Sequence, residues 1–454
     1  MFTTKPGMVK ISRMKEIRTA PATVVAVACL AVAIDNIAYA ISFACLPHVF
    51  EDMQLASESK VGLASTMFGV GSFFTSILSG IVSDRIRSRK LPIIVGAVGY
   101  SLCGVILFFS SKLHHVLLYR LVNGLASGCT YPIATATVGD VYPNKLLGLQ
   151  MALVNTFGSV GYTIGPVLGG ALYDRVGIRG VSAVLNSTST SGVCTSRSTS
   201  KIILFDQEAQ ESQKPGSFWD SSEKQSQINS IESSLDGAKS MPLWKLVFQW
   251  QVLSASMTTL SVGMLAGSLE NVLPIYTKDQ FKVSASKTGL LFVVNGGMAI
   301  ALSTPIGWIV DRLIRKHGER MRAYVELAGL VLIGGAIVLL GSSTSFAMVT
   351  GAEIWFAAAL LLVNVPVMSS FGDFVNALGL DSMAQSYGLY NSFWSLSSTI
   401  APPIATTLYT QIGYKATVAG VLTGLCATCA ALILAQPLWQ LLRNASKRKL
   451  DRFL

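Results

Sequence analysis

The 454-residue chain has little charge, because Asp, Glu, Lys and Arg together make up 13% of it while hydrophobic residues make up 51%. A soluble chain of this size carries about twice that charged fraction. Histidine is also scarce, and no nucleophile–base or metal-ligand spacing occurs around His48, His114, His115 and His317. This composition excludes an ordinary soluble protein and argues against an enzyme. We expect no catalytic residue, no metal and no cofactor.

Cysteine is nearly missing from the polar parts of the chain. Of the seven cysteines, all but Cys194 lie inside apolar runs. Buried small side chains explain this distribution better than a disulfide framework does. Cys426 and Cys429 have no second pair of cysteines with which to hold a metal, so we expect no zinc site there.

Long apolar runs are what the sequence has in plenty, and each is long enough to cross a bilayer as a helix. The eleven convincing runs lie at about 22–46, 62–83, 92–110, 115–138, 149–172, 252–276, 288–310, 323–341, 346–370, 387–410 and 416–438. The first run lacks the short apolar core and the cleavage site of a signal peptide, so we expect it to be retained. The chain is therefore predicted to be an all-α, multi-pass membrane protein.

The net charge of +11 gathers beside these runs instead of forming a surface for nucleic acid, which we exclude as a partner. Basic residues cluster at 5–18, 84–90, 311–322 and 443–452. Because positively charged loops stay in the cytoplasm, both termini are predicted to be cytoplasmic. The number of crossings must then be even, and eleven convincing runs leave one missing.

The missing sixth span is due at about 176–204, where the chain reads "VGIRGVSAVLNSTSTSGVCTSRSTSKIILF". Each charge at the centre of a span costs about 2.5 to 3.5 kcal/mol on the insertion scale. The stretch is a degenerate span buried against its neighbours, a true loss with altered topology, or a coding error such as a retained intron, which we favour. Polar residues at about 205–240 follow and predict a disordered linker.

The chain is therefore predicted to consist of four parts. Residues 1–180 form an N-terminal bundle, 181–243 the degenerate span and linker, 244–442 a C-terminal bundle and 443–454 a basic cytoplasmic tail. The two bundles share a repeat, because 80–86 read "GIVSDRI" and 307–313 read "GWIVDRL" at the end of the second run of each half. This repeat indicates two parallel six-span halves whose Asp and Arg pair at the cytoplasmic ends. A merely positive loop is the alternative.

Three motifs give a resemblance to a known family. "GIVSDRIRSRK" at 80–90, "YRLVNGLASG" at 119–128 and "GYTIGPVLGG" at 161–170 resemble the second-loop, fourth-span and fifth-span motifs of the major facilitator superfamily, the last being typical of its proton-coupled exporters. The resemblance implies two helical bundles that rock about a central cavity. The conformational motifs would comprise Gly80, Asp84, Arg85, Arg89, Gly158, Gly161, Gly165, Pro166 and Gly169.

The four glycines of the fifth run recur every three or four residues and so share one helix face. We expect this face to be a hinge-like seam that lets the bundles move, with an ordinary small-residue packing face as the alternative. If the face is such a seam, a bulkier residue at Gly165 is expected to block the transport cycle more than it harms folding.

Two further segments, "LAVAIDNIAYAISFACLPHVF" at 30–50 and "LAGSLENVLPIY" at 265–276, resemble the vesicular amine and acetylcholine transporters and their fungal drug:proton antiporter relatives. That branch carries a lysine in span two and aspartates in spans ten and eleven, where this chain has Phe68, Asn364 and Asn391. The reduced charge network does not support a monoamine or acetylcholine substrate.

An acid in the middle of a span is costly unless it faces a cavity, has a partner or takes up a proton, and is functional by default. Asp35 is therefore the predicted proton-coupling residue. The resemblance implies that Arg120 faces the cavity and sets its electrostatics, with an arginine that reaches toward the membrane surface as the alternative. Tyr276 and Phe292 are further candidates for an aromatic lining. The predicted substrate-binding residues are Asn36, Tyr39, Glu270, Asn295, Asn364, Asn391 and Trp394.

The sequence thus predicts a proton-coupled antiporter that exports or sequesters a small cationic or amphipathic solute by alternating access. Its partners would be this solute, protons and the lipid bilayer, and we expect a monomer in the plasma membrane or a vacuolar or vesicular membrane. A non-transporting, receptor-like protein and a uniporter or importer are the alternatives.

Overall fold

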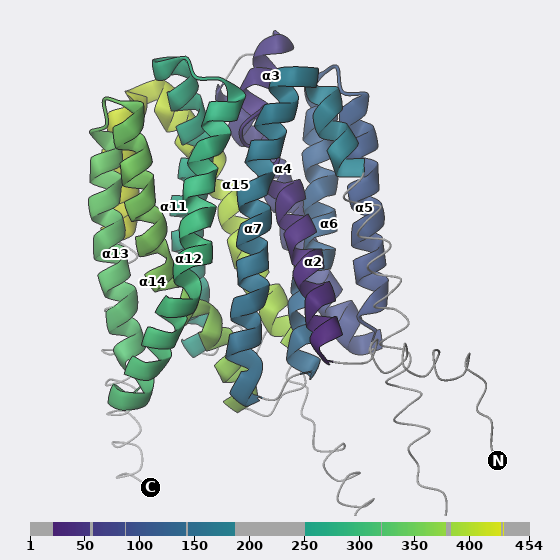
Figure 1. Ribbon diagram of the computed structural model, residues 1–454, viewed down its shortest axis with the longest axis vertical. Helices are drawn as coiled ribbons and strands as arrows, with labels where there is room; N and C mark the ends of the chain where they lie inside the picture. The colour runs from purple at the N-terminus through teal and green to yellow at the C-terminus, as the bar shows by residue number, and fades with distance from the viewer. Residues whose placement is uncertain are drawn as a thin grey trace, which may run out of the picture.

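The computed structural model describes residues 21–54, 58–86, 88–141, 144–186, 250–318, 320–377, 383–427 and 430. Across these ranges the regular secondary structure is helical, and the long helices stand side by side (Figure 1). The predicted linker, the basic tail and the end of the last apolar run lie outside the described residues.

Helices of the N-terminal half are α2 (Pro21–Ala40), α3 (Leu46–Asp52), α4 (Glu58–Ile86), α5 (Lys90–Phe108), α6 (Leu113–Val141) and α7 (Asn144–Val176). Helices of the C-terminal half are α11 (Trp250–Phe281), α12 (Ala285–His317), α13 (Arg320–Gly341), α14 (Phe346–Ala377) and α15 (Met383–Lys415), continued by the π-helical segment η1 (Ala416–Leu422). In the part of the chain described, these helices follow the predicted apolar runs.

The apolar character of the helices explains their arrangement. Six described helices are long and apolar enough to cross a membrane by length and composition, and Val24–Ala40 is a shorter apolar helix. Helix α5 shows the pattern, because Val98 and Leu102 are exposed while Tyr100 and Cys103 are buried. Such a helix satisfies its backbone internally and presents its outer apolar face to lipid.

The two ends of the bundle are told apart by the helix ends that lie there. At one end, where α2 begins and α4 ends, lie Arg85, Arg89 and Arg322, and we call it the basic end. At the other, the far end, lie α3 and the connection between α11 and α12. Figure 1 shows the far end at the top, with α3, and the basic end at the bottom.

The beginning of the predicted sixth span is helical. After Gly177, which has a φ of +70°, residues 178–186 form a helix. Val181 and Leu185 in it are fully buried and join a cluster with Tyr100 of α5. The charged Arg179 lies at the far end, 5.9 Å from the centre of the Phe108 ring. Residues 178–186 therefore fit a degenerate span buried against its neighbours, and 187–249 lie outside the described residues.

The most extensive contacts between the halves are made by two pairs of helices. Helix α4 packs against α15 and α7 packs against α12, while α2 packs against α7 inside the N-terminal half. Figure 1 shows α7 and α12 side by side, and the two helices lie closest to each other near the far end. These two contacts hold the walls of a central cavity together.

Candidate functional site

A cavity of about 260 Å³ lies between the two halves. Helices α2, α4, α6 and α7 line it from one side and α11, α12, α14 and α15 from the other. The wall contains every substrate-binding residue predicted from the sequence, namely Asn36, Tyr39, Glu270, Asn295, Asn364, Asn391 and Trp394. Asp35 and Phe292 also line the cavity.

Asp35 is held on the N-terminal side of this cavity. Its side chain is 4% exposed and accepts a hydrogen bond from the hydroxyl of Tyr100, on α5. Ser127 of α6, which also lines the cavity, is a second hydrogen-bonding partner. Hydroxyls can donate to a carboxylate and accept from a protonated acid, so this pocket accommodates both forms of Asp35.

Glu270 connects the two halves. It lies on α11, in the C-terminal half, and accepts hydrogen bonds from two tyrosines of the N-terminal half. The hydroxyl of Tyr39 lies 2.9 Å from one carboxylate oxygen and that of Tyr162 lies 2.8 Å from the other. Because Glu270 lies toward one end of its apolar run, the sequence also allows a glutamate that reaches toward the membrane surface. The structure instead places Glu270 in the cavity wall.

Arg120 lies behind the cavity wall and not in it, which corrects the expectation that it faces the cavity. The side chain is fully buried and donates a 3.1 Å hydrogen bond to the backbone oxygen of Tyr39. Its guanidinium carbon lies 5.5 Å from the Phe43 ring centre and 5.6 Å from that of Phe68. Its positive charge interacts electrostatically with Glu270, which lines the cavity, so Arg120 acts on the cavity only indirectly.

Glu353 of α14 is a cavity residue that the sequence reasoning missed. It is 4% exposed and lines the same cavity as Asp35 and Glu270. The signal was present, because an acid inside the apolar run 346–370 is an intramembrane acid by the criterion that selected Asp35. The cavity therefore has three carboxyl groups, and no Lys, Arg or His occurs among the described residues that line it.

Some predicted residues have roles besides lining the cavity. The amide of Asn391 donates to Ser76 at 2.8 Å, and Ser395 contacts Ser72 at 2.8 Å, so the α4–α15 contact is partly polar.

Tyr276 is absent from the cavity wall, because its hydroxyl donates to the Ser343 backbone oxygen within the C-terminal half.

Comparison with known proteins identifies the family. The model of the Major Facilitator Superfamily matches residues 27–394. The chain belongs to the major facilitator superfamily. An MFS-type transporter of Schizosaccharomyces pombe, C18.02, is 22% identical over 388 residues, which cover 80% of this chain and 83% of the relative. The multidrug resistance protein MdtG of Serratia proteamaculans is 24% identical over 314 residues, covering 68% and 69%.

The fold of this superfamily is also found by structural comparison. The crystal structure of the human organic anion transporter MFSD10 superposes with a TM-score of 0.62 at 18% identity, covering 91% of this chain and 99% of that one. The predicted major facilitator fold is thus confirmed. Because members of the family are membrane transporters, the prediction of a transporter and not an enzyme is confirmed as well.

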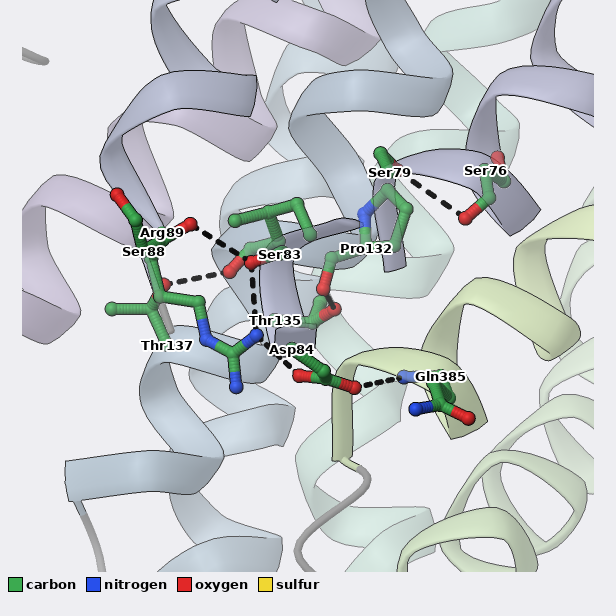
Figure 2. A network of polar contacts seen from close by, with 11 residues as sticks. Ser76, Ser79, Ser83, Asp84, Ser88, Arg89, Pro132, Thr135, Thr137 and Gln385 are labelled. Atoms are coloured by element: carbon green, nitrogen blue, oxygen red, sulfur yellow. Dashed lines mark hydrogen bonds and ion pairs between the residues drawn. The ribbon is translucent and has the colours of Figure 1, made fainter. Parts of the chain in front are cut away.

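The second-loop motif of the superfamily bridges the halves at the basic end (Figure 2). Asp84 forms an ion pair with Arg89 at 2.5 Å and accepts a hydrogen bond from the backbone nitrogen of Gln385 at 3.3 Å. Gln385 is in the first turn of α15, whose free N–H groups favour a negative charge. Gly80 lies beside α15 at Gly388, whereas Arg85 is exposed. The corresponding Asp311 side chain lies outside the described residues.

The fifth-span glycines face a partner that the sequence did not indicate. Gly158, Gly161 and Gly165 point at α2, and Gly169 points at Ile41, the residue after α2, all in the same half. A Cβ on Gly165 would lie 3.0 Å from the backbone oxygen of Ile37. The contact between the halves uses another face of α7, where Pro166 lies against α12 and a Cβ on Gly289 would lie 2.7 Å from the Pro166 oxygen. The expected seam between the bundles is therefore corrected to packing within one.

Proposed function

We propose that this superfamily member is a proton-coupled antiporter that exports or sequesters a small cationic or amphipathic solute by alternating access. The observation that carries the proposal is the cavity itself, which contains Asp35, Glu270 and Glu353 with no basic side chain among its described lining residues. Buried acids of this kind bind protons or cations, since an unpaired charge is costly away from water. The similarity to a multidrug resistance protein supports an efflux direction.

Asp35 is the proposed proton-coupling residue. Its carboxyl group lines the cavity and has hydroxyl partners that suit both protonation states. A cationic solute in the cavity favours the ionised form and a proton favours the neutral form, so the two compete. Release of the solute on one side and of the proton on the other then couples the two movements.

Contacts at both ends support a mechanism in which the halves rock. At the far end, Lys278 of α11 forms an ion pair with Glu51 of α3 at 2.5 Å, and Ser286 of α12 donates to Asp174 of α7. At the basic end, Asp84 contacts the start of α15. Opening toward either side requires that one of these sets of contacts breaks while the cavity stays between the halves.

We further propose that the basic end faces the cytoplasm, which places both termini there. The proposal also includes the division of the chain into four parts, with boundaries at 180, 243 and 442. It further includes a monomeric state. The membrane is the plasma membrane or a vacuolar or vesicular membrane, because export and sequestration both move the solute out of the cytoplasm.

The test uses the purified protein in liposomes with an imposed pH gradient and ethidium as the transported cation. Asp35→Asn is expected to abolish gradient-driven ethidium movement while the protein stays folded, since the change removes a costly buried charge. Glu326→Gln is the matched control, because Glu326 is 5% exposed but lies outside the cavity wall. Undiminished transport by Asp35→Asn contradicts the coupling role. Ethidium binding without transport by the unchanged protein favours the receptor-like alternative, and transport that ignores the gradient favours a uniporter.

A further inference from the structure

Glu353 is a buried acid whose hydrogen-bonding capacity is only partly used. Its side chain interacts with the Asn295 amide, but its Oε1 atom is buried and has no hydrogen-bond partner among the described residues. A carboxyl group can accept up to about four hydrogen bonds when ionised. The group therefore has unused hydrogen-bonding capacity next to the cavity that the residue lines.

The charges around Glu353 favour a positively charged ligand. Glu353 interacts electrostatically with Glu270, so two acids of the C-terminal half face one cavity. The two tyrosines that donate to Glu270 give each of its carboxylate oxygens one hydrogen bond. Arg120 acts on Glu270 from behind the wall, and no described Lys or Arg forms an ion pair with Glu353. Glu353 is thus the acid of this pair whose negative charge has fewer partners among the described residues.

The surroundings of Glu353 indicate what kind of cation fits. Phe356 and Leu360 follow it by one and two turns on α14 and line the cavity, as does Phe292 of α12. Aromatic and aliphatic walls next to a carboxylate bind an organic cation by cation–π and apolar contacts, whereas a small hydrated metal ion needs several oxygen ligands. Among the described residues no group of three or more metal-ligating side chains is present.

We infer that Glu353 and Asn295 form a cation subsite in the C-terminal half that binds the positive group of an organic cation, while Glu270 serves mainly to hold Tyr39 and Tyr162. The inference rests on the proposed function in that it assumes a cationic solute. It separates the work of the three acids. Asp35 exchanges the proton, Glu270 joins the halves, and Glu353 selects the charge of the solute.

The experiment measures equilibrium binding to the purified full-length protein in detergent, without a gradient. Tritiated tetraphenylphosphonium is the cationic probe, and tetraphenylborate, which has the same shape and the opposite charge, is the matched control ligand. The unchanged protein is expected to bind the cation and not the anion. Glu353→Gln is expected to weaken binding of the cation at least tenfold, whereas Glu326→Gln, a buried acid outside the cavity wall, leaves it unchanged.

Several outcomes overturn the inference. They are no binding of tetraphenylphosphonium by the unchanged protein, equal binding of the two probes, and affinity of Glu353→Gln within twofold of the unchanged protein. If Glu353→Gln does not fold, Glu353→Asp keeps the charge and moves it by one methylene, and an unchanged affinity for the cation then counts against the subsite. Because no gradient is present, lost coupling in Asp35→Asn leaves this binding result intact, so the two proposals fail separately.

Discussion

Gly289 offers a direct way to shift the balance between the two open states. A Cβ at this position of α12 would lie 2.7 Å from the Pro166 oxygen and 3.3 Å from the Cα of Val167, both backbone atoms of α7. Backbone cannot rotate away as a flexible side chain does, so the methyl group of Gly289→Ala must push the helices apart. The far end is closed by this contact, and the cost therefore falls on the state in which the far end is closed.

The size of the effect follows from packing. Adding a methyl group to a well-packed contact costs about 1 to 3 kcal/mol. Alanine gains about 1 kcal/mol of helix propensity over glycine, but this gain is the same in both states and cancels. Gly289→Ala is therefore expected to favour the far-open state by roughly five- to 150-fold, since 1 to 3 kcal/mol corresponds to that range.

The assay is the distance between spin labels on the far ends of the two halves. Lys112, between α5 and α6, and Thr344, between α13 and α14, are exposed and suit labelling after the native cysteines are replaced. Gly297→Ala is the control on the same helix, because a Cβ there meets nothing within 4 Å. The reasoning is refuted if Gly289→Ala leaves the distance distribution unchanged, or if both variants shift it equally.

Three further predictions concern the ends of the bundle and the glycine face. Asp84→Ala removes the ion pair with Arg89 and the contact with Gln385, so labels at Ile86 and Lys316 are expected to move apart, with Arg85→Ala as control. An unchanged distance speaks against the latch. Gly165→Leu is expected to destabilise the N-terminal half by about 1 to 3 kcal/mol or more, because the side chain meets the α2 backbone. Leu168→Phe, at a 37% exposed position, is expected to cost less, and equal melting temperatures contradict this assignment. The hydrogen bond from Lys278, together with the positive charge of that residue, lowers the pKa of Glu51. This far-end ion pair is therefore complete above the ordinary carboxyl pKa and is lost as the pH falls through the lowered value. Lowering the pH is therefore expected to shift the far-end label distances slightly toward the open state. If the Glu51→Gln protein shows the same pH dependence, the ion pair between Glu51 and Lys278 is not its cause.

The sequence predicts the cavity residues well because their chemistry is local. An acid, an amide or an aromatic ring in an apolar run is costly or unusual in lipid, and such residues turn inward whatever the neighbouring helix is. Asp35, Asn295 and Trp394 are found in the cavity wall for this reason. Glu353 carries the same signal, because it is an acid inside the apolar run 346–370.

Which helices meet is not encoded in the same local way. Periodicity shows that the fifth-run glycines share a face, but it does not indicate whether α2 or α12 lies opposite. The placement of Arg120 behind Phe43 and Phe68 likewise depends on how α2, α4 and α6 cross. For the sixth span, the charge of Arg179 argued against a helix, yet its position at the far end beside Phe108 removes most of that cost.

The serine-lined contact between α4 and α15 bears on how fast such a protein can turn over. Ser76 keeps a 2.7 Å hydrogen bond to the Ser72 backbone oxygen, and Ser395 keeps one of the same length to the Asn391 backbone oxygen. When the helices separate, neither hydroxyl proton is left without an acceptor. An orphaned buried polar group costs about 1 to 3 kcal/mol, and each 1.36 kcal/mol added to an activation barrier slows a step tenfold. Serine hydroxyls that hydrogen-bond to their own helix thus keep the activation barrier for rocking low. Asparagine or glutamine at these positions would hold the halves together more strongly and slow turnover.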